Sequence, residues 1–212
     1  MDGQARRERL ARSRLYLVLE ARPHGEDPLP LLDAALRGGV DIVQLREKEL
    51  EDEALVAAAE PFRRACEEHG ALFVLNDRPE LAEACAADGV HVGRSDTPVE
   101  EARARVGPDR LLGLSVSTAD ELGVVEGADY VGVTAFATPT KEDAIAGGLD
   151  LLRAAAKALT VPWFAIGGIE LSNAAEVVAA GTPGIAVVRA IRDAADPEAA
   201  ARMLRSALDR EE

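Results

Sequence analysis

The sequence predicts an α/β fold, a (β/α)8 TIM barrel formed as a single compact domain over residues 1–212. Short runs of β-branched and aliphatic residues alternate with longer runs at helical spacing, from one end of the chain to the other. Eight such pairs fit into 212 residues, which is near the short end for a barrel and leaves room only for short loops. A doubly wound open sheet gives the same alternation and stays as the alternative.

The predicted strands are nearly all apolar, as strands covered on both faces of a parallel sheet should be. Residues 1–13 precede the first of them and form an N-terminal extension that we expect to be helical or flexible. The eight strands are predicted at Leu15–Leu19, Ile42–Leu45, Leu72–Leu75, Val90–Val92, Leu111–Leu114, Tyr130–Val133, Trp163–Ile166 and Ile185–Val188.

Helix start signals set the frame of the segments between the strands. Thr97 is placed to cap a helix in which Pro98 is the first residue and Glu100 completes a capping box. Asp196 followed by Pro197 predicts the start of the last helix. The capping-box spacing recurs at Thr118 with Glu121 and at Asn173 with Glu176.

Composition excludes several classes of protein. A hydrophobic content of 48% is enough for a sizeable core and excludes disorder. The 24 Lys and Arg against 38 Asp and Glu give a net charge of −14 with no basic run, which predicts no nucleic-acid partner and no anionic membrane partner. No apolar stretch of membrane-spanning length occurs and the first residues carry mixed charge, so we expect a cytoplasmic protein.

Neither the cysteines nor the histidines predict a catalytic pair. Cys66 and Cys85 lie on apolar stripes at helical spacing and are predicted to be core residues, with a thiol nucleophile as the weaker alternative. His91 lies within a predicted strand, His69 at a helix end and His24 in the first loop. We expect all three histidines to be structural or exposed.

Polar residues at the ends of the predicted strands are the candidates for a site, because barrel enzymes place their chemistry at the carboxyl ends of the strands. After the second strand, alternation points Gln44, Arg46 and Lys48 toward the mouth of the barrel. Two cations and an amide facing one spot predict an anion site. A solvated charge cluster is the alternative.

Two carboxylates follow successive strands at the same end. Asp77 comes after the third strand and Asp96 after the fourth, and neighbouring strand ends lie roughly 5 Å apart. The pair is suited to Mg²⁺, which proteins hold with one or two carboxylates and substrate phosphate oxygens. As the alternative, Asp77 caps a helix beginning near Pro79 and Asp96 merely precedes the Thr97 cap.

The remaining strand ends carry further anion-binding signals. Ser115 offers a hydroxyl after the fifth strand, and no Ser/His/Asp arrangement would make it a nucleophile, so we expect it to donate or accept hydrogen bonds. Residues 137–148 form a long loop, which predicts a lid closing on an anion. Gly167 and Gly168 after strand seven and Arg189 after strand eight stand where barrels usually bind phosphate.

These residues together resemble the thiamine-phosphate synthase family over essentially the whole chain. Its most specific motifs here are VQLREK at 43–48, NDR at 76–78, GVHVG at 89–93 with Asp96, TPTK at 138–141 and FAIGGI at 164–169. The resemblance implies a TIM-barrel transferase that joins hydroxymethylpyrimidine pyrophosphate to hydroxyethylthiazole phosphate. The products would be thiamine phosphate and pyrophosphate, formed by Mg²⁺-assisted displacement through a dissociated pyrimidine carbocation.

The resemblance also implies roles for individual residues. The Mg²⁺ ligands would be Asp77 and Asp96. The catalytic residues would be Arg46, Lys48, Lys141 and Ser115. Pyrimidine pyrophosphate would be bound by Gln44, Arg46, Lys48, Asn76, Ser115 and Lys141. Thiazole phosphate would be bound by Thr138, Pro139, Thr140, Gly168, Val188 and Arg189.

The chain departs from the family pattern in three places, all at the rim. Val133–Phe136 stands where a Gly-Pro pair is common, Ser117 where a histidine is frequent, and Arg94-Ser95 where Gln plus an acid is frequent. None of these departures touches the metal, pyrophosphate or glycine positions.

Two other functions are weighed against the synthase. A thiazole tautomerase-like paralogue would share the barrel and the thiazole-phosphate site, but it would have little use for the cluster of Asp77, Asp96, Arg46, Lys48 and Lys141. A non-catalytic thiamine-precursor-binding regulator would retain the same binding residues. The sequence is compatible with a homo-oligomer but does not indicate the oligomeric state. It also does not distinguish plain from carboxylated thiazole phosphate as the substrate. Small phosphorylated molecules are the expected partners.

Overall fold

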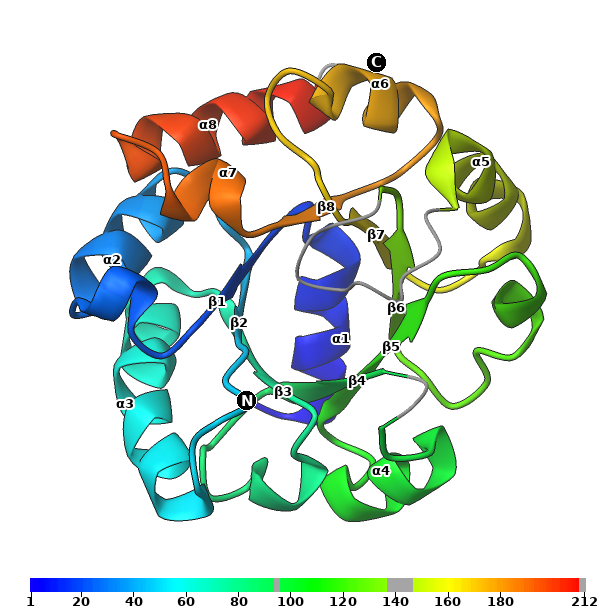
Figure 1. The fold of residues 1–212 in the computed structure, drawn as a ribbon. Coiled ribbons are helices and arrows are strands. Elements are labelled where there is room, and N and C mark those ends of the chain that lie inside the picture. Colours follow the sequence, from blue (N-terminus) through cyan, green and yellow to red (C-terminus); the bar gives the residue numbers. More distant parts are fainter. Residues whose placement is uncertain (94–95, 137–146, 210–212) are drawn as a thin grey trace.

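Eight parallel strands close into a barrel, with β1 paired to β8 (Figure 1). The computed structural model describes residues 1–93, 96–136 and 147–209. This confirms the predicted TIM barrel and rules out the open sheet. The strands are β1 (Leu15–Leu19), β2 (Ile42–Leu45), β3 (Leu72–Asn76), β4 (Gly89–Val92), β5 (Leu111–Val116), β6 (Tyr130–Thr134), β7 (Trp163–Ile166) and β8 (Ile185–Val187).

Helices cover the outside of the barrel (Figure 1). The α-helices are α1 (Gly3–Arg12), α2 (Leu29–Arg37), α3 (Asp52–His69), α4 (Val99–Val106), α5 (Gly148–Ala158), α6 (Ala174–Ala179), α7 (Arg189–Arg192) and α8 (Pro197–Leu208). Short 3₁₀ helices are η1 (Pro23–Gly25), η2 (Pro79–Leu81) and η3 (Asp120–Gly123).

Two of the helix predictions, those for the segments after β3 and β5, are wrong. The connections after β3 and β5 contain only the 3₁₀ turns η2 and η3, where helical spacing near Pro79 and the capping box at Thr118 predict α-helices. Left-handed backbone soon follows each turn, at Ala86 (φ 48°) and at Gly127 (φ 87°). An α-helix cannot continue through such a residue, so both segments turn into the next strand.

Three of the predicted capping residues, Thr97, Asn173 and Asp196, lie near the start of an α-helix, and one of them caps it as predicted. Asp196 accepts a hydrogen bond from the Ala199 backbone N–H at 3.0 Å, as predicted for the start of α8. Thr97 is not the cap of α4, which begins after Pro98 with no side-chain cap among the described residues. The Asn173 side chain does not cap α6 either, because it accepts from the Glu170 N–H and donates to the Gly168 carbonyl oxygen, both at 2.9 Å.

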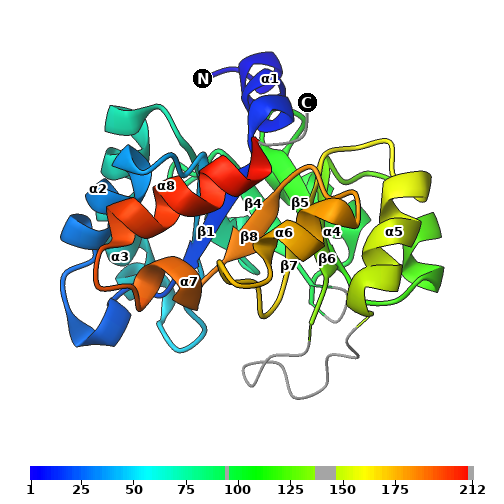
Figure 2. The ribbon, with the colours of Figure 1, turned by 90° about the horizontal axis from the view of Figure 1, so that it is seen from above.

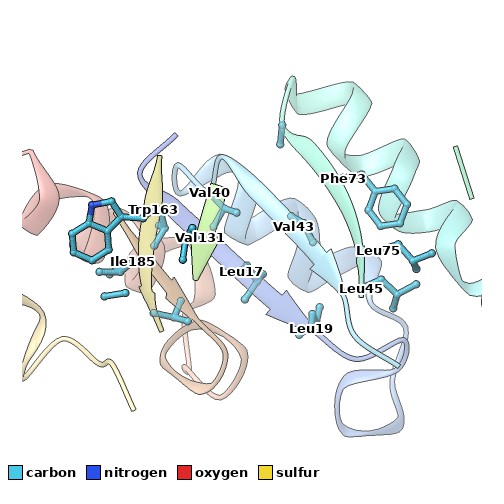
Figure 3. Close-up of a cluster of buried hydrophobic side chains, with 14 of the residues drawn as sticks. Leu17, Leu19, Val40, Val43, Leu45, Phe73, Leu75, Val131, Trp163 and Ile185 are labelled. Carbon is cyan, nitrogen blue, oxygen red and sulfur yellow. The ribbon is translucent and has the colours of Figure 1, made fainter. Parts of the chain in front are cut away.

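Alternation along each strand builds two separate cores. Outward side chains such as Leu17, Val43 and Phe73 pack under the helices (Figure 3), while inward ones such as Tyr16 and Phe164 fill the barrel. Both faces of every strand are therefore covered. This explains why the strands are apolar throughout in the sequence.

Helix α1 covers the end of the barrel at which the strands begin (Figure 2). Its Leu10 is 2% exposed and belongs to the inner core. Arg6 forms an ion pair with Asp88, directly before β4, and Arg7 forms one with Asp129, directly before β6, each at 2.9 Å. The opposite end, where the strands finish, is therefore the one left for a ligand. None of the described helices is both long and apolar enough to cross a membrane.

We expect Asp129→Ala to lower the free energy of unfolding by about 3 kcal/mol or more, the cost typical of breaking a buried ion pair. Asp129 is only 12% exposed, pairs with Arg7 and Arg103, and accepts the Leu112 N–H at 2.9 Å. Denaturant unfolding followed by circular dichroism measures the effect. Asp150→Ala is the matched control, since the Asp150 side chain is 95% exposed and its loss should change stability little. Equal losses in the two variants would contradict the prediction.

Candidate active site

A cavity of about 980 Å³ opens at the carboxyl ends of the strands. It is lined by side chains from the interior of the barrel and from the loops that follow the strands. Arg46, Lys48, Asp77 and Asp96 lie after β2, β3 and β4 on one side of its rim, whereas the side after β7 and β8 combines Gly167 and Gly168 with the charged residues Glu170, Arg189, Arg192 and Asp193. The cavity thus has two chemically different ends.

Gln44, Arg46 and Lys48 all line this cavity, as their alternation along the chain predicts. Gln44 is buried at 4% exposure, whereas the Lys48 side chain is 56% exposed. The Lys48 Nζ lies 4.0 Å from the Asp77 Oδ2. The three residues thus run from the floor of the barrel to its rim.

Asp77 and Asp96 lie side by side at the ends of β3 and β4. Asp77 has left-handed backbone (φ 60°), and its N–H donates to the His91 carbonyl oxygen at 2.9 Å. Asp96 Oδ2 accepts the Gly93 N–H at 2.9 Å, and a Cβ at position 93 would collide with that oxygen. A non-glycine residue in the left-handed region stores strain of a kind often found at functional sites.

The electrostatics of this pair favour a cation. Burial, together with the charge of Asp96 and a hydrogen bond to it, raises the pKa of Asp77, while Lys48 and Asn76 act in the opposite direction. Like charges that are held close repel, and a divalent ion relieves that repulsion. Among the described residues, no group of three or more His, Cys, Asp or Glu side chains could hold a metal. Oxygens of a ligand and of water would have to complete the coordination.

The other end of the cavity is formed by the loops after β7 and β8. Gly167 (φ 103°) and Gly168 (φ 61°) both have left-handed backbone, and a Cβ on Gly167 would lie 2.5 Å from the Phe136 carbonyl oxygen. Val188 and Arg189 line the cavity beside them. The Asn173 side chain holds the Gly168 carbonyl oxygen, which fixes the conformation of this loop.

His91 is a buried, hydrogen-bonded residue of the barrel interior, which agrees with the expectation that it is structural. Its Nε2 lies 2.9 Å from the Ser115 Oγ and its Nδ1 lies 3.3 Å from the Tyr130 hydroxyl. Tyr130 in turn contacts Tyr16, and all of these residues line the cavity. Sequence reasoning missed the two tyrosines and the histidine, although each alternates to the inside of its strand. Which strands face each other across the barrel is not a local property of the sequence.

Two further polar residues are placed as follows. Asn76 is buried at 7% exposure and lines the cavity. Ser117, one of the departures from the family pattern, has its Oγ 3.0 Å from the Thr134 Oγ1.

Both cysteines are buried, and burial raises the pKa of each thiol, which disfavours a thiolate nucleophile. The candidates Thr138, Pro139, Thr140 and Lys141, and the pair Arg94 and Ser95, lie outside the described residues.

Comparison with known proteins decides the family. A model of the family described as thiamine monophosphate synthase matches residues 15–191, which is most of the chain and the whole of the barrel sheet. The chain belongs to this family.

Relatives of the thiamine monophosphate synthase family agree with that assignment. The chain is 47% identical to a thiamine-phosphate synthase of Thermobifida fusca (strain YX), with 95% of each chain covered. It is 48% identical to one of Thermosynechococcus vestitus, covering 95% of this chain and 57% of the relative. A solved thiamine phosphate pyrophosphorylase from Pyrococcus furiosus superposes with a TM-score of 0.85 at 35% identity, covering 96% of this chain and 97% of the other. The chain therefore spans less than two thirds of some curated relatives and nearly the full length of others.

Proposed function

We propose that this chain is a thiamine-phosphate synthase, a transferase that joins hydroxymethylpyrimidine pyrophosphate to hydroxyethylthiazole phosphate and releases pyrophosphate. The observation that carries the proposal is the convergence of Asp77 and Asp96 beside Lys48, in a cavity that Arg46 also lines. This cluster suits a metal-bound diphosphate. Gly167 and Gly168 at the other end suit a monophosphate.

Mg²⁺ is the proposed cofactor, and the residues present fit it. Asp77 and Asp96 are hard oxygen ligands held close together, and their mutual repulsion supplies the reason for a cation. When bound, Mg²⁺ would neutralise charge on the departing pyrophosphate. Two protein carboxylates leave coordination positions for pyrophosphate oxygens and water, which is the usual arrangement for this ion.

The chain's own residues would stabilise the leaving group and hold the two rings in line. The thiazole nitrogen displaces pyrophosphate from the exocyclic carbon of the pyrimidine, so the reaction needs no nucleophilic side chain. Arg46 and Lys48, with Lys141 by the family resemblance, would donate hydrogen bonds to pyrophosphate oxygens as the C–O bond breaks. Gln44, Asn76 and Ser115 would orient the pyrimidine end, and the cavity would exclude water from the reacting carbon.

Thiazole phosphate would bind at the β7 and β8 end of the cavity. Gly168 and Val188 offer backbone there, and Arg189 adds a positive charge. The segment Thr138–Thr140 completes this end by the family resemblance. Arg46 and Lys48 at one end of the cavity and Arg189 at the other are the cations that would contact the phosphate oxygens, and bound Mg²⁺ would offset the charges of Asp77 and Asp96.

The decisive experiment incubates the protein with both precursors and Mg²⁺ and follows thiamine phosphate and pyrophosphate. Formation of both, dependent on Mg²⁺, supports the synthase. Isomerisation of a thiazole phosphate without pyrophosphate release would instead indicate the tautomerase-like paralogue. Precursor binding with no reaction would indicate the regulator. The proposal places the enzyme in the cytoplasm.

Lys141→Ala should lower turnover by about 100-fold to 1,000-fold, the loss typical of removing one preorganised donor to a developing anion. We expect the melting temperature to change little. Initial rates at saturating precursors and thermal unfolding measure the two effects. Lys157→Ala provides the control, since Lys157 is an exposed residue of α5. A parallel loss of turnover and stability in Lys141→Ala would remove this residue from the catalytic group.

A further inference from the structure

Five polar side chains form one continuous chain of hydrogen bonds across the floor of the cavity. The Gln44 Nε2 lies 2.7 Å from the Tyr16 hydroxyl, which lies 3.0 Å from the Tyr130 hydroxyl. The Tyr130 hydroxyl lies 3.3 Å from the His91 Nδ1, and the His91 Nε2 lies 2.9 Å from the Ser115 Oγ. Each residue comes from a different strand, namely β2, β1, β6, β4 and β5 (Figure 1).

The first member sets the direction of this chain. The Gln44 amide nitrogen can only donate, so the Tyr16 oxygen accepts from it. Tyr16 is 2% exposed, and the Tyr130 oxygen is the acceptor that the structure offers to its hydroxyl proton. The proton of Tyr130 then goes to the other partner of its hydroxyl, the Nδ1 of His91. A buried hydroxyl that kept its proton unpaired would be costly.

We infer that this chain of hydrogen bonds holds His91 in the neutral tautomer that carries its proton on Nε2. Ser115 is thereby made a hydrogen-bond donor to a ligand in the cavity. Nε2–H donates to the Ser115 Oγ, so the serine proton is directed to another acceptor. The Ser115 side chain lines the cavity, where the proposed pyrophosphate is rich in acceptor oxygens. His91, Tyr130 and Tyr16 act through Ser115 and are positioning residues.

Two features of the fold hold the order of donors in place. Burial raises the pKa of both tyrosines, so each phenol keeps its single proton and passes on one hydrogen bond. Gly113 leaves the space in which Tyr130 contacts His91, because a Cβ at position 113 would collide with the Tyr130 ring and would lie 2.5 Å from the His91 Nδ1. The same order explains why Ser115 lacks a general base: the nitrogen that faces it carries a proton.

The tautomer can be read directly by ¹⁵N NMR of the histidine rings in the protein without ligand. The chain has three histidines, and the variants His24→Gln and His69→Gln assign the signals of His91 by elimination. We expect a protonated Nε2 and a bare Nδ1 at neutral pH. A protonated Nδ1 with a bare Nε2, or protons on both nitrogens, would overturn the inference.

A matched pair of variants tests the direction of the chain. Tyr130→Phe removes the donor to Nδ1, so the His91 signals should move toward an average of the two tautomers. Tyr16→Phe removes an equally buried hydroxyl one step earlier and leaves Tyr130 with Nδ1 as its acceptor, so the tautomer should persist. Loss of the tautomer in Tyr16→Phe with retention in Tyr130→Phe would overturn the order.

The kinetic consequence rests on the proposed function, whereas the tautomer does not. Tyr130→Phe should lower turnover by on the order of tenfold, the value of one ordinary hydrogen bond, and should have no further effect in the Ser115→Ala background. Additive losses would overturn the claim that Tyr130 acts through Ser115. If wild-type protein shows the expected tautomer but makes no thiamine phosphate, the proposed function fails and the hydrogen-bond order stands.

Discussion

Asp77→Asn should lower thiamine phosphate formation by at least about 100-fold while leaving the protein folded. The substitution removes a charge from the proposed Mg²⁺ site, and a bound metal is worth several kcal/mol to a developing anion. Asparagine tolerates the left-handed backbone found at Asp77 (φ 60°), so the turn after β3 is preserved. The melting temperature should stay the same or rise, because Asp96 then no longer faces a like charge. Pyrophosphate release over a Mg²⁺ titration and thermal unfolding measure these effects.

Asp88→Asn makes the same chemical change at the opposite end of the barrel and serves as the control. Asp88 accepts from the Arg6 Nε at 2.9 Å and from the Phe73 N–H at 3.1 Å, far from the cavity mouth. It should lower stability while turnover per folded molecule is kept. If instead Asp77→Asn were to retain turnover at every Mg²⁺ concentration, the metal site would lie elsewhere.

Gly113→Ala should destabilise the barrel and disturb the floor of the cavity together. A Cβ at position 113 would collide with the buried ring of Tyr130 and approach the His91 ring, and both are held by strands on either side of β5. Overpacking of this kind costs typically 1–3 kcal/mol. Because the residue has no left-handed backbone, the effect comes from space and not from conformation. Denaturant unfolding gives the stability, and the His91 ¹⁵N signals report the local disturbance.

Gly123→Ala is the matched control for Gly113→Ala. A Cβ on Gly123 meets nothing within 4 Å, and the residue lies at the end of η3. Its stability and its His91 signals should match the wild type. If the two alanine variants behaved alike, the crowding at Gly113 would not be the cause of the loss.

Much of the fold can be predicted from the sequence because it depends on local pattern. The runs that became β1, β2 and β7 match the predicted strands residue for residue, since an apolar run flanked by turn residues is itself the signal. The absence of α-helices after β3 and β5 could not be predicted, because it depends on the left-handed backbone at Ala86 and Gly127. Propensity for helix was outweighed by the need to enter the next strand.

The candidate site divides in the same way. Asp77 with Asp96, and Gln44 with Arg46 and Lys48, could be placed together from sequence because the ends of parallel strands share one edge. The roles of the segment at 138–141 come from the family resemblance alone. His91 with Ser115 could not be paired beforehand, although their strands are neighbours, because the pairing depends on register and on the space left by Gly113.

By itself, then, the sequence determined the barrel, the end that carries the polar residues and the family, since each of these follows from residue type and spacing along the chain. The left-handed turn at Asp77, the closure of the other end by α1 and the contacts that link Gln44 to Ser115 become visible only in the tertiary structure. These features arise where side chains from strands distant in sequence meet inside a closed barrel. Their geometry is set by packing and by the pairing of buried donors with acceptors.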